Sequence, residues 1–556
     1  MSNTVVRKGH PKALWILFMT EMWERFGYYL MVGIFFLYLI DPRKHGGKGF
    51  DATIASDVVG SYIALVYLTP FIGGLIADRI LGYRKAIILG GSLMACGYFG
   101  LAMSGDMAMY ISLGLIIVGN GFFKPNISTL LGNIYNAEDL KPKKDVAYNI
   151  FYMGINIGAF FCNFVAAYLR NYYGWGYAFA AAGFGMILAL IIFISMMKHV
   201  KEGDVVKPVQ KEDMSLGLMF LYVFVPAIIT GAIGWNMTKW LGHPIFATIT
   251  NDAFFFACIP IIIFYLGLYF KASHEDKRGL GALLSFFAVS IVFWVIYNQN
   301  STALTIWADQ YTNRHMPVAA VKYTKPFGML QVTTSDSMTV TKVDKHFVAV
   351  LDAKGNTQEV KGVDPYLLNL PKDQWPKAGE KENLVSPELY QSANPIYIVI
   401  LTPLIIGLFG FFKRKGKEIN TPMKIAFGMI IAGLSSLTMY FAVKSTDIYV
   451  DKTSMIWLLS TYGIFSIGEL LISPIGLSMV SKLAPARLTA LMMGGWFLIN
   501  SMAGKISGMM GSLWDKFEDK GNYFLILFFS ALASAAIMFV MVKWLSAVVK
   551  EKTGSN

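Results

Sequence analysis

The chain has 556 residues, of which 55% are hydrophobic and only 15% charged, and its mean hydropathy is +0.51. This composition excludes a soluble globular enzyme, a disordered chain and a coiled coil, because an average soluble domain is about 25% charged. The net charge of +13 does not indicate nucleic-acid binding, since no basic, aromatic-interleaved soluble module is present. We therefore expect a polytopic protein of the lipid bilayer, with Lys and Arg in loops that set its orientation.

The apolar runs predict an all-α protein with fourteen membrane-spanning helices of about 20 residues each. The pattern divides into an N-terminal six-helix bundle at 1–197, a linker with two extra helices at 198–280, and a C-terminal six-helix bundle at 281–556. The predicted spans are 13–40, 55–77, 85–104, 108–131, 147–169, 177–197, 217–240, 254–270, 281–307, 394–412, 422–443, 454–480, 487–511 and 523–548.

Basic residues gather in the short loops that end even-numbered spans, as at 79–85, 141–144 and 413–417. The positive-inside rule places these loops and both termini in the cytoplasm. Residues 309–393, by contrast, are polar and mixed in charge, with strand-like alternation at 337–350 and a turn at 352–356. This pattern predicts a small β-rich extracytoplasmic insertion that interrupts the C-terminal bundle.

The first span carries three ionisable residues where a membrane makes charge expensive. Glu21, Glu24, Arg25 and Tyr28 recur at helical spacing and share one face. A charge at the bilayer centre costs about 2.5–3.5 kcal/mol on insertion scales. Two carboxylates beside one guanidinium leave surplus negative charge, which a proton or another cation can neutralise. We interpret the group as proton-handling, with a purely structural ion pair as the alternative.

Other spans contain isolated charges. Lys124 precedes Pro125 in the fourth span, and Glu469 lies in the middle of the span at 454–480, where it needs a cation or a proton. Lys505 is nearer the end of its span, and we expect it to extend toward the lipid headgroups. Uncharged polar or aromatic side chains accompany these charges and predict a wet central cavity. They include Asn156, Trp294, Asn298 and Asn394, with Ser473 one turn from Glu469.

Motifs of catalysis or cofactor binding are absent from the sequence. It contains no HExxH, no Walker-type glycine loop and no GxSxG with partners. All seven histidines fall in tails, loops or the insertion, so histidine is not the expected proton relay. We therefore expect no enzymatic activity, no metal and no cofactor, with a proton gradient as the energy source.

Several segments resemble known transporter signatures. Residues 73–85, which include Asp78, Arg79 and Arg84, resemble the short inner loop of the major facilitator superfamily, where charges hold one closed state. The run Glu21–Tyr29 is similar to the ExxERFxYY signature of proton-dependent oligopeptide transporters. Residues 151–160 and 468–474 resemble two further signatures of that family, so the resemblance covers both halves of the membrane part.

This resemblance implies two bundles that rock around a site near the membrane midplane. In such proteins Glu21, Glu24 and Arg25 would couple protons. Lys124 and Glu469 would approach each other as an inner gate and bind the two charged ends of a peptide. The remaining implied substrate-binding positions are Tyr28, Tyr67, Asn156, Trp294, Asn298, Asn394, Ser473 and Trp496.

The sequence departs from the family pattern at the outer gate. Many members carry an arginine where this chain has Val32 and a carboxylate where it has Asn298, and those two groups pair. Both are neutral here, so the expected latch is missing. We expect Asp309, on the face of Asn298, to supply a substitute gating residue, with Lys505 as its candidate partner.

The resemblance predicts a proton-coupled symporter that imports di- and tripeptides, acts as a monomer and resides in a bacterial plasma (inner) membrane. One alternative is a proton-coupled transporter of another small anionic or zwitterionic solute, because Val32 and Asn298 are unusual. The second alternative is a non-transporting receptor or scaffold that presents the insertion.

Overall fold

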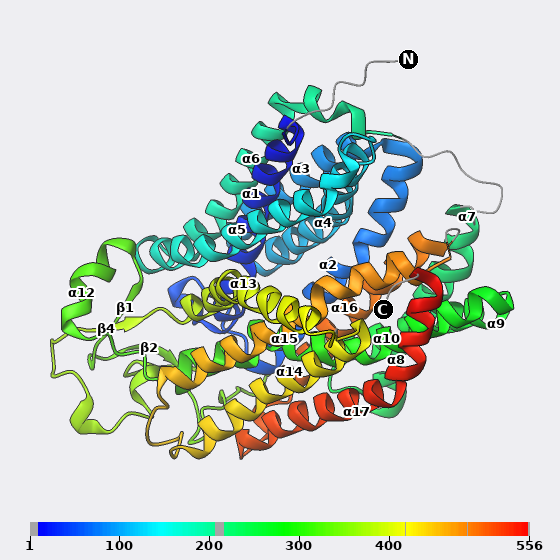
Figure 1. Ribbon diagram of the computed structural model, residues 1–556. Helices are drawn as coiled ribbons and strands as arrows, with labels where there is room; N and C mark the ends of the chain where they lie inside the picture. The colour runs from blue at the N-terminus through cyan, green and yellow to red at the C-terminus, as the bar shows by residue number, and fades with distance from the viewer. Residues whose placement is uncertain (1–8, 206–215, 418, 486–487, 554–556) are drawn as a thin grey trace.

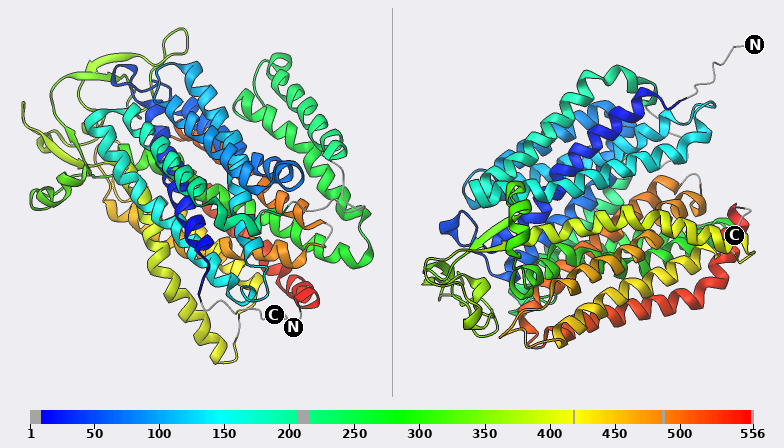
Figure 2. Two further views of the ribbon diagram at one scale, coloured as in Figure 1. Left: turned by 90° about the horizontal axis from the view of Figure 1, so that it is seen from above. Right: turned by 60° about the vertical axis from the view of Figure 1, so that its left-hand side comes forward.

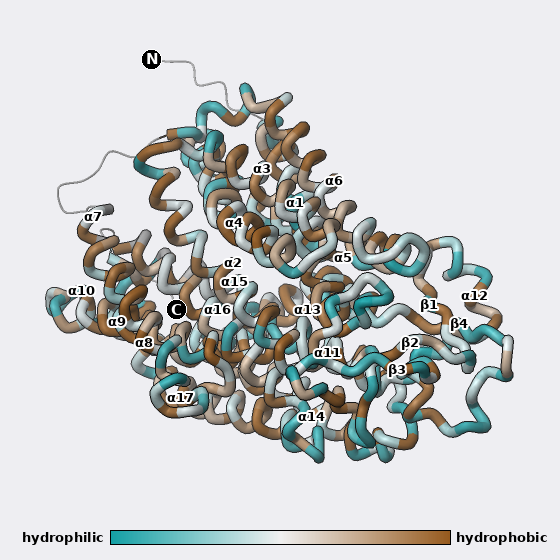
Figure 3. Tube along the Cα trace, turned by 180° about the vertical axis from the view of Figure 1, so that it is seen from behind, coloured by the Kyte–Doolittle hydropathy of each residue, from teal (hydrophilic) through white to brown (hydrophobic). Residues whose placement is uncertain are grey.

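A computed structural model describes residues 9–205, 216–417, 419–485 and 488–553 (Figure 1). Residues 206–215 of the predicted linker therefore lie outside the described residues. Long helices dominate the structure, and hydrophobic residues cover most of their length, whereas hydrophilic residues concentrate in loops and in the insertion (Figure 3).

The first six long helices pack against one another, with α3 on α4, α1 on α5 and α6, and α2 on α4. Small residues permit this packing, as in other membrane bundles. A Cβ on Gly119 would lie 2.6 Å from the carbonyl oxygen of Gly90, so α3 and α4 approach closely. The bounds are α1 Lys12–Ile40, α2 Ala52–Ile76, α3 Tyr83–Leu101, α4 Asp106–Ile134, α5 Lys144–Tyr173 and α6 Trp175–Ser195.

The next helices form a hairpin and a second packed group. In the hairpin, α7 (Leu216–Met219) leads into α8 (Val225–Leu241), which packs on α9 (Ile249–Lys271). In the second group, α14 packs on α15 and α17, and α10 packs on α16 and α17. Its bounds are α10 His274–Asn298, α11 Ala303–Ile306, α13 Ala393–Arg414, α14 Thr421–Lys444, α15 Met455–Leu483, α16 Thr489–Ser512 and α17 Lys520–Thr553.

All fourteen predicted spans overlap helices of the described chain, which confirms the predicted fold class. Within the described residues, eleven helices are long and apolar enough to cross a membrane by length and composition alone. The spans in α1, α3 and α16 do not reach that threshold, because charged residues or many small residues interrupt their apolar runs.

Residues between the ninth and tenth spans form a small insertion with two two-stranded antiparallel sheets. Strand β1 (Leu330–Thr333) pairs with β4 (Glu382–Val385), and β2 (Met338–Thr341) pairs with β3 (Glu359–Gly362), while α12 spans Val318–Thr324. The predicted turn at 352–356 is confirmed, since the carboxylate of Asp352 accepts hydrogen bonds from the N–H groups of Lys354 and Asn356. The predicted start at 309 is slightly early, because helical chain continues to Tyr311.

The two helix groups meet beside the insertion, which we call the insertion end (Figures 1 and 2). Their ribbons diverge toward the opposite end, where α1 begins and α17 ends, which we call the termini end. Across the groups, α2 packs on α16 and α5 packs on α13, and α9 also contacts both α2 and α16.

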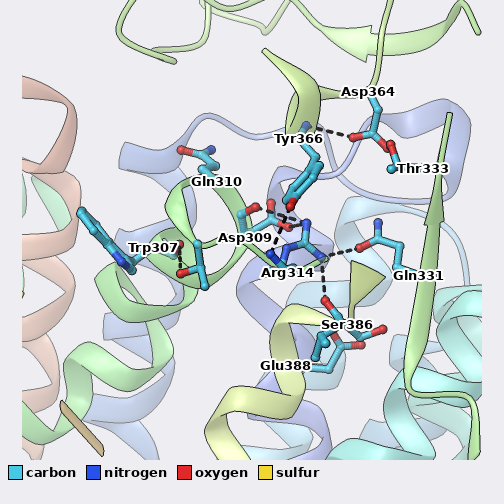
Figure 4. A network of polar contacts seen from close by, with 12 residues as sticks. Trp307, Asp309, Gln310, Arg314, Gln331, Thr333, Asp364, Tyr366, Ser386 and Glu388 are labelled. Atoms are coloured by element: carbon cyan, nitrogen blue, oxygen red, sulfur yellow. Dashed lines mark hydrogen bonds and ion pairs between the residues drawn. The ribbon is translucent and has the colours of Figure 1, made fainter. Parts of the chain in front are cut away.

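Arg314 anchors the insertion to the helix that precedes it (Figure 4). Its side chain is only 2% exposed. The guanidinium donates to the carbonyl oxygen of Val385 at 3.0 Å, to Gln331 Oε1 at 2.9 Å and to Asp309 Oδ1 at 3.2 Å. It also lies 4.9 Å from the ring centroid of Tyr366. One cation thus joins the end of a membrane helix to both strands of the β1–β4 sheet.

We expect Arg314→Gln to loosen this sheet, because the change leaves buried acceptors without their charged donor. The free energy of local opening around 380–390 should fall by about 3 kcal/mol, as for a broken buried ion pair. Hydrogen–deuterium exchange of that peptide measures the change. The matched control is Arg278→Gln, whose guanidinium pairs with Glu551 at an exposed surface and should change exchange little. Equal exchange in the two variants would contradict the anchoring role.

Lys452, in the loop between α14 and α15, gives the insertion a pH-dependent stability. Its ammonium group donates to the carbonyl oxygen of Gln310 at 2.7 Å and to Asn369 Oδ1 at 2.5 Å, and lies 4.1 Å from the ring centroid of Tyr366. Burial and the nearby Arg314 lower the pKa of Lys452 from its ordinary value of 10.5 to about 7. The carboxylates of Asp309, Asp364 and Asp451 partly oppose this shift.

The unfolded chain therefore binds one more proton than the folded chain between about pH 7 and pH 10.5. Linkage makes the free energy of unfolding rise with pH in that window, by at most about 1.4 kcal/mol per pH unit. We expect Lys452→Met to flatten this rise, as measured by insertion-peptide exchange at pH 7, 8 and 9. Lys444→Met, at a half-exposed ion pair with Asp519, serves as the control. Parallel pH profiles for the native protein and Lys452→Met would rule the effect out.

Candidate functional site

The ionisable residues of α1 form one buried cluster. Glu21 is 3%, Glu24 0% and Arg25 3% exposed. Arg25 donates hydrogen bonds to Glu24 from both Nε and Nη2, and Nη2 lies 2.6 Å from Glu24 Oε1. Glu21 Oε1 lies 3.3 Å from Arg25 Nε. Helical spacing therefore brings all three predicted residues into contact.

The two carboxylates of this cluster are not equivalent. Glu24 holds the guanidinium through both of its oxygens. Glu21 makes one longer contact, and its Oε2 is buried without a hydrogen-bond partner. A buried carboxylate oxygen without a partner is costly when ionised and is readily satisfied by a proton. Glu21 is thus the carboxylate of the two that has fewer hydrogen-bond donors.

Neighbouring helices complete the surroundings of this cluster. Arg25 Nη2 lies 3.5 Å from Asn120 Oδ1 on α4, and the guanidinium is 4.9 Å from the ring centroid of Tyr28. Lys124, one helical turn beyond Asn120, places its ammonium group 4.2 Å from the ring centroid of Tyr67 on α2. The first helix group therefore presents two cations, Arg25 and Lys124, close to aromatic faces.

The second helix group presents an acidic pole. Glu469 on α15 is 7% exposed, and its Oε2 accepts a hydrogen bond from Asn394 Nδ2 at 2.9 Å. The same amide donates to Ser466 Oγ at 2.9 Å. Ser473 lies one turn along α15 and is half-buried. Asn394 at the start of α13 thus holds the Glu469 carboxylate in place.

Aromatic residues of the same group form a stack beside this pole. Trp496 on α16 lies over Phe286 with ring centroids 5.4 Å apart and 8° between their planes. Trp294 meets Trp496 edge-on at 6.2 Å, and the indole N–H of Trp294 is buried without a partner. Asn298 is also buried, one turn along α10. Asn156 donates to the carbonyl oxygen of Tyr152 in its own helix.

The basic motif between α2 and α3 is held by a residue that the sequence did not single out. Asp204, just after the short helical segment Met197–Gly203, accepts from Arg84 Nε at 2.6 Å and from the backbone N–H of Tyr83 at 2.8 Å. Asp78 and Arg79 lie in a π-helical turn, Ala77–Leu81. Arg84 is therefore anchored within the first half of the chain rather than across the two groups.

The predicted pair of Asp309 and Lys505 is wrong. Asp309 Oδ1 instead pairs with Arg314 at 3.2 Å (Figure 4). Lys505 does not extend toward headgroups either, since it is 1% exposed and lies 2.8 Å from Asp57 Oδ1 on α2. The regular helix α10 ends at Asn298, and Asp309 lies beyond this end, where the insertion begins. Lys505 instead faces α2.

Other contacts join the two helix groups at the insertion end. Arg170 Nη1 on α5 lies 2.9 Å from Glu388 Oε2, which is fully buried. Asn171 donates to Ser386 Oγ at 2.7 Å, and the Gln391 amide donates to the carbonyl oxygen of Gly33 at 3.1 Å. These contacts close the insertion end. Among the described ion pairs, none joins Lys124 to Glu469, so the predicted inner gate is not formed in this conformation.

Sequence reasoning missed Asp57, Asp204 and Glu388. Asp57 is the third residue of the predicted span 55–77, near the membrane surface, so it lacks the mid-span position that identified Glu469. The other two lie beside loops, where a lone carboxylate is ordinary. Among the described residues, no group of three or more His, Cys, Asp or Glu side chains is arranged to hold a metal ion.

Comparison with known proteins supplies the family. A family model for the POT family matches residues 84–329 and 380–526. An uncharacterized transporter, YclF, of Bacillus subtilis (strain 168) is 31% identical over 518 residues, which cover 92% of this chain and 89% of the relative. A di-/tripeptide transporter of Lactococcus lactis subsp. lactis (strain IL1403) is 28% identical over 96% of both chains.

A solved structure agrees with these sequence matches. The crystal structure of a POT family transporter in complex with 5-aminolevulinic acid has a TM-score of 0.74 and 26% identity. The match covers 97% of this chain and 98% of that chain. Relatives in sequence and structure are thus transporters rather than enzymes.

Proposed function

Because the chain belongs to the POT family of transporters, we propose that it is a proton-coupled symporter that imports di- and tripeptides by alternating access. The observation that carries this proposal is the placement of opposite charges on the two helix groups. Lys124 belongs to α4 of the first group, and Glu469 belongs to α15 of the second. A zwitterionic peptide has one negative and one positive end, so it can bridge these two residues.

The α1 cluster supplies the proton coupling in this proposal. Glu21 takes a proton while the protein faces outward, which weakens its hold on Arg25. Peptide then binds, with its carboxylate at Lys124 and its amino group at Glu469 and Asn394. The two helix groups then rock against each other, and both the peptide and the proton are released at the termini end. Lys124 and Glu469 pair in the return step, when no peptide separates them.

Orientation in the membrane completes the proposal. The Lys- and Arg-rich loops at 79–85, 141–144 and 413–417 support a cytoplasmic termini end. The polar insertion then lies outside the cytoplasm of a bacterial inner membrane. Closure at the insertion end makes the described conformation one that faces the cytoplasm. We propose that a monomer suffices, since both poles of the site belong to one chain.

Uptake of labelled dialanine into proteoliposomes with an imposed pH gradient, acid outside, tests the function. We expect gradient-dependent accumulation in the native protein and none above background in empty vesicles. Absence of uptake, in protein that remains folded by its thermal unfolding profile, would contradict peptide transport.

A second candidate function is transport of another small zwitterion or anion. Two observations favour keeping it: the solved relative binds 5-aminolevulinic acid, and Val32 and Asn298 leave the expected outer charge pair neutral. The same two poles fit any amino acid derivative whose amino and carboxyl groups are separated like those of a dipeptide. A thermal-shift comparison of dipeptides, 5-aminolevulinic acid and nitrate distinguishes the candidates by which ligand raises the melting temperature.

A further inference from the structure

The contact between α2 and α16 is unusually close for two helices that belong to different groups. A Cβ on Gly508 would lie 2.6 Å from the Cα of Gly60, and a Cβ on Gly511 would lie 2.8 Å from Ser56 Oγ. Small residues at such spacing let two helix backbones touch, which dispersion and weak hydrogen bonds then stabilise. This seam, defined by Ser56 and Gly60 on α2 and by Gly508 and Gly511 on α16, must separate if the insertion end opens.

An ion pair lies beside the seam. Lys505 Nζ is 2.8 Å from Asp57 Oδ1 and also donates to Ser61 Oγ at 2.6 Å. Lys505 is 1% exposed and Asp57 is 12% exposed. Each charge therefore depends on the other helix for its compensation. Neutralising one partner of such a pair leaves the other charge buried without compensation in the closed state, which is costly and should favour the open state.

The hairpin of extra helices takes part in the same contact. Thr250, in the first turn of α9, donates to both oxygens of Asp57 at 2.6 Å and lies 2.8 Å from Lys505 Nζ. Thr248, which caps α9, donates to Asp57 Oδ1 at 3.0 Å. Thus α9 touches the pair at the point where the two groups meet. In this closed arrangement the Thr250 hydroxyl contacts both charges, and the Thr248 hydroxyl contacts Asp57.

We propose that Asp57 and Lys505 are the gating residues of the insertion end, and that α9 holds them together in the closed state. The pair takes the place of the latch that is missing at Val32 and Asn298, at a different pair of helices. Opening the gate separates the seam, lets water reach both charges and breaks their bonds to Thr250. This inference rests on the proposed alternating-access function, but it concerns the shape of the protein and not the identity of its substrate.

Distance measurements between spin labels test the gate directly. We place labels at Ser104, exposed between α3 and α4, and at Val450, exposed between α14 and α15. Cys96, Cys162 and Cys258 are replaced by alanine so that only the labels report. In lipid nanodiscs without ligand, the native pair should give mainly the short distance of the closed insertion end. Asp57→Asn and Lys505→Gln should each lower the ratio of short to long distances about tenfold.

Two further variants make the result specific. The charge-swapped double variant Asp57→Lys/Lys505→Asp keeps both charges and should restore the short distance. Asp519→Asn removes a carboxylate of equal charge from an ion pair inside one group, between the residue that precedes α17 and Lys444 at the end of α14, and should leave the distribution unchanged. Thr250→Val should shift the ratio in the same direction as Asp57→Asn, but by a smaller factor.

The proposal is overturned if Asp57→Asn and Lys505→Gln both retain the native distribution, or if Asp519→Asn shifts it equally. Should a single neutral variant fail to fold, the charge-swapped variant decides, because a folded swap that stays open also overturns the proposal. The distances do not depend on peptide, so loss of dialanine uptake with the expected distances would leave the gate supported. Normal uptake with unchanged distances would instead reject the gate alone.

Discussion

Glu21→Gln is expected to abolish proton-driven accumulation of dialanine. One proton that moves inward through 100 mV supplies about 2.3 kcal/mol, which corresponds to roughly fiftyfold accumulation of a co-transported neutral peptide. The native protein should therefore concentrate labelled dialanine up to that limit, and Glu21→Gln should bring the inside-to-outside ratio to about one. Proteoliposomes with an imposed potential of 100 mV, negative inside, and the same pH on both sides measure both ratios.

The reason lies in the asymmetry of the α1 cluster. Both carboxylate oxygens of Glu24 accept hydrogen bonds from Arg25, whereas one buried oxygen of Glu21 has no hydrogen-bond partner. Glutamine resembles the protonated carboxyl in shape and charge, so the variant mimics one coupling state permanently. It should still exchange peptide across the membrane when labelled and unlabelled peptide are at equal concentration. Exchange at the native rate with no accumulation is the signature of lost coupling.

Two outcomes would contradict this role. Full accumulation in Glu21→Gln would transfer the coupling role to another carboxylate, with Glu24 the first candidate. If Glu21→Gln lost both exchange and accumulation, Glu21 would be needed for peptide binding or for folding rather than for proton coupling. Asp519→Asn, which removes a carboxylate from an exposed ion pair with Lys444 on the second helix group, is the matched control and should accumulate peptide normally.

Lys124→Gln and Glu469→Gln are expected to weaken dialanine binding and to change which end of the peptide matters. A charge-assisted hydrogen bond contributes about 2 kcal/mol, or roughly thirtyfold in affinity. The native protein should therefore discriminate against N-acetyl-dialanine, which lacks the positive end, and against dialanine amide, which lacks the negative end. Competition with labelled dialanine gives the three affinities.

Each variant should lose its preference at one end of the peptide and keep its preference at the other end. Glu469→Gln should bind dialanine and N-acetyl-dialanine about equally, because the acidic pole that recognises the amino group is gone. Lys124→Gln should bind dialanine and dialanine amide about equally. If both variants lose affinity for all three peptides by the same factor, the residues act as a gate or as structure, and not as the two poles of the site.

The sequence by itself determined the fold class and which ionisable residues share one face of α1. Apolar runs of about 20 residues allow only spans, and a charge within such a run is expensive enough to mark a functional position. Glu21, Glu24 and Arg25 share a face because helical spacing is fixed by backbone geometry. Local rules of this kind act within a few residues, so they need no knowledge of partners. The same rules placed Asp352 in its turn.

Only the tertiary structure decided which distant residues meet. The sequence predicts Asp309, on the face of Asn298, as a gating residue with Lys505 as its candidate partner. In the structure Asp309 instead pairs with Arg314, and Lys505 pairs with Asp57. Depth in a membrane follows from the number of residues, but the facing of two helices follows from how their small residues pack. The glycines of α2 and α16 turn Lys505 toward Asp57. That contact between residues 448 positions apart joins the two halves of the chain, and no local pattern specifies it.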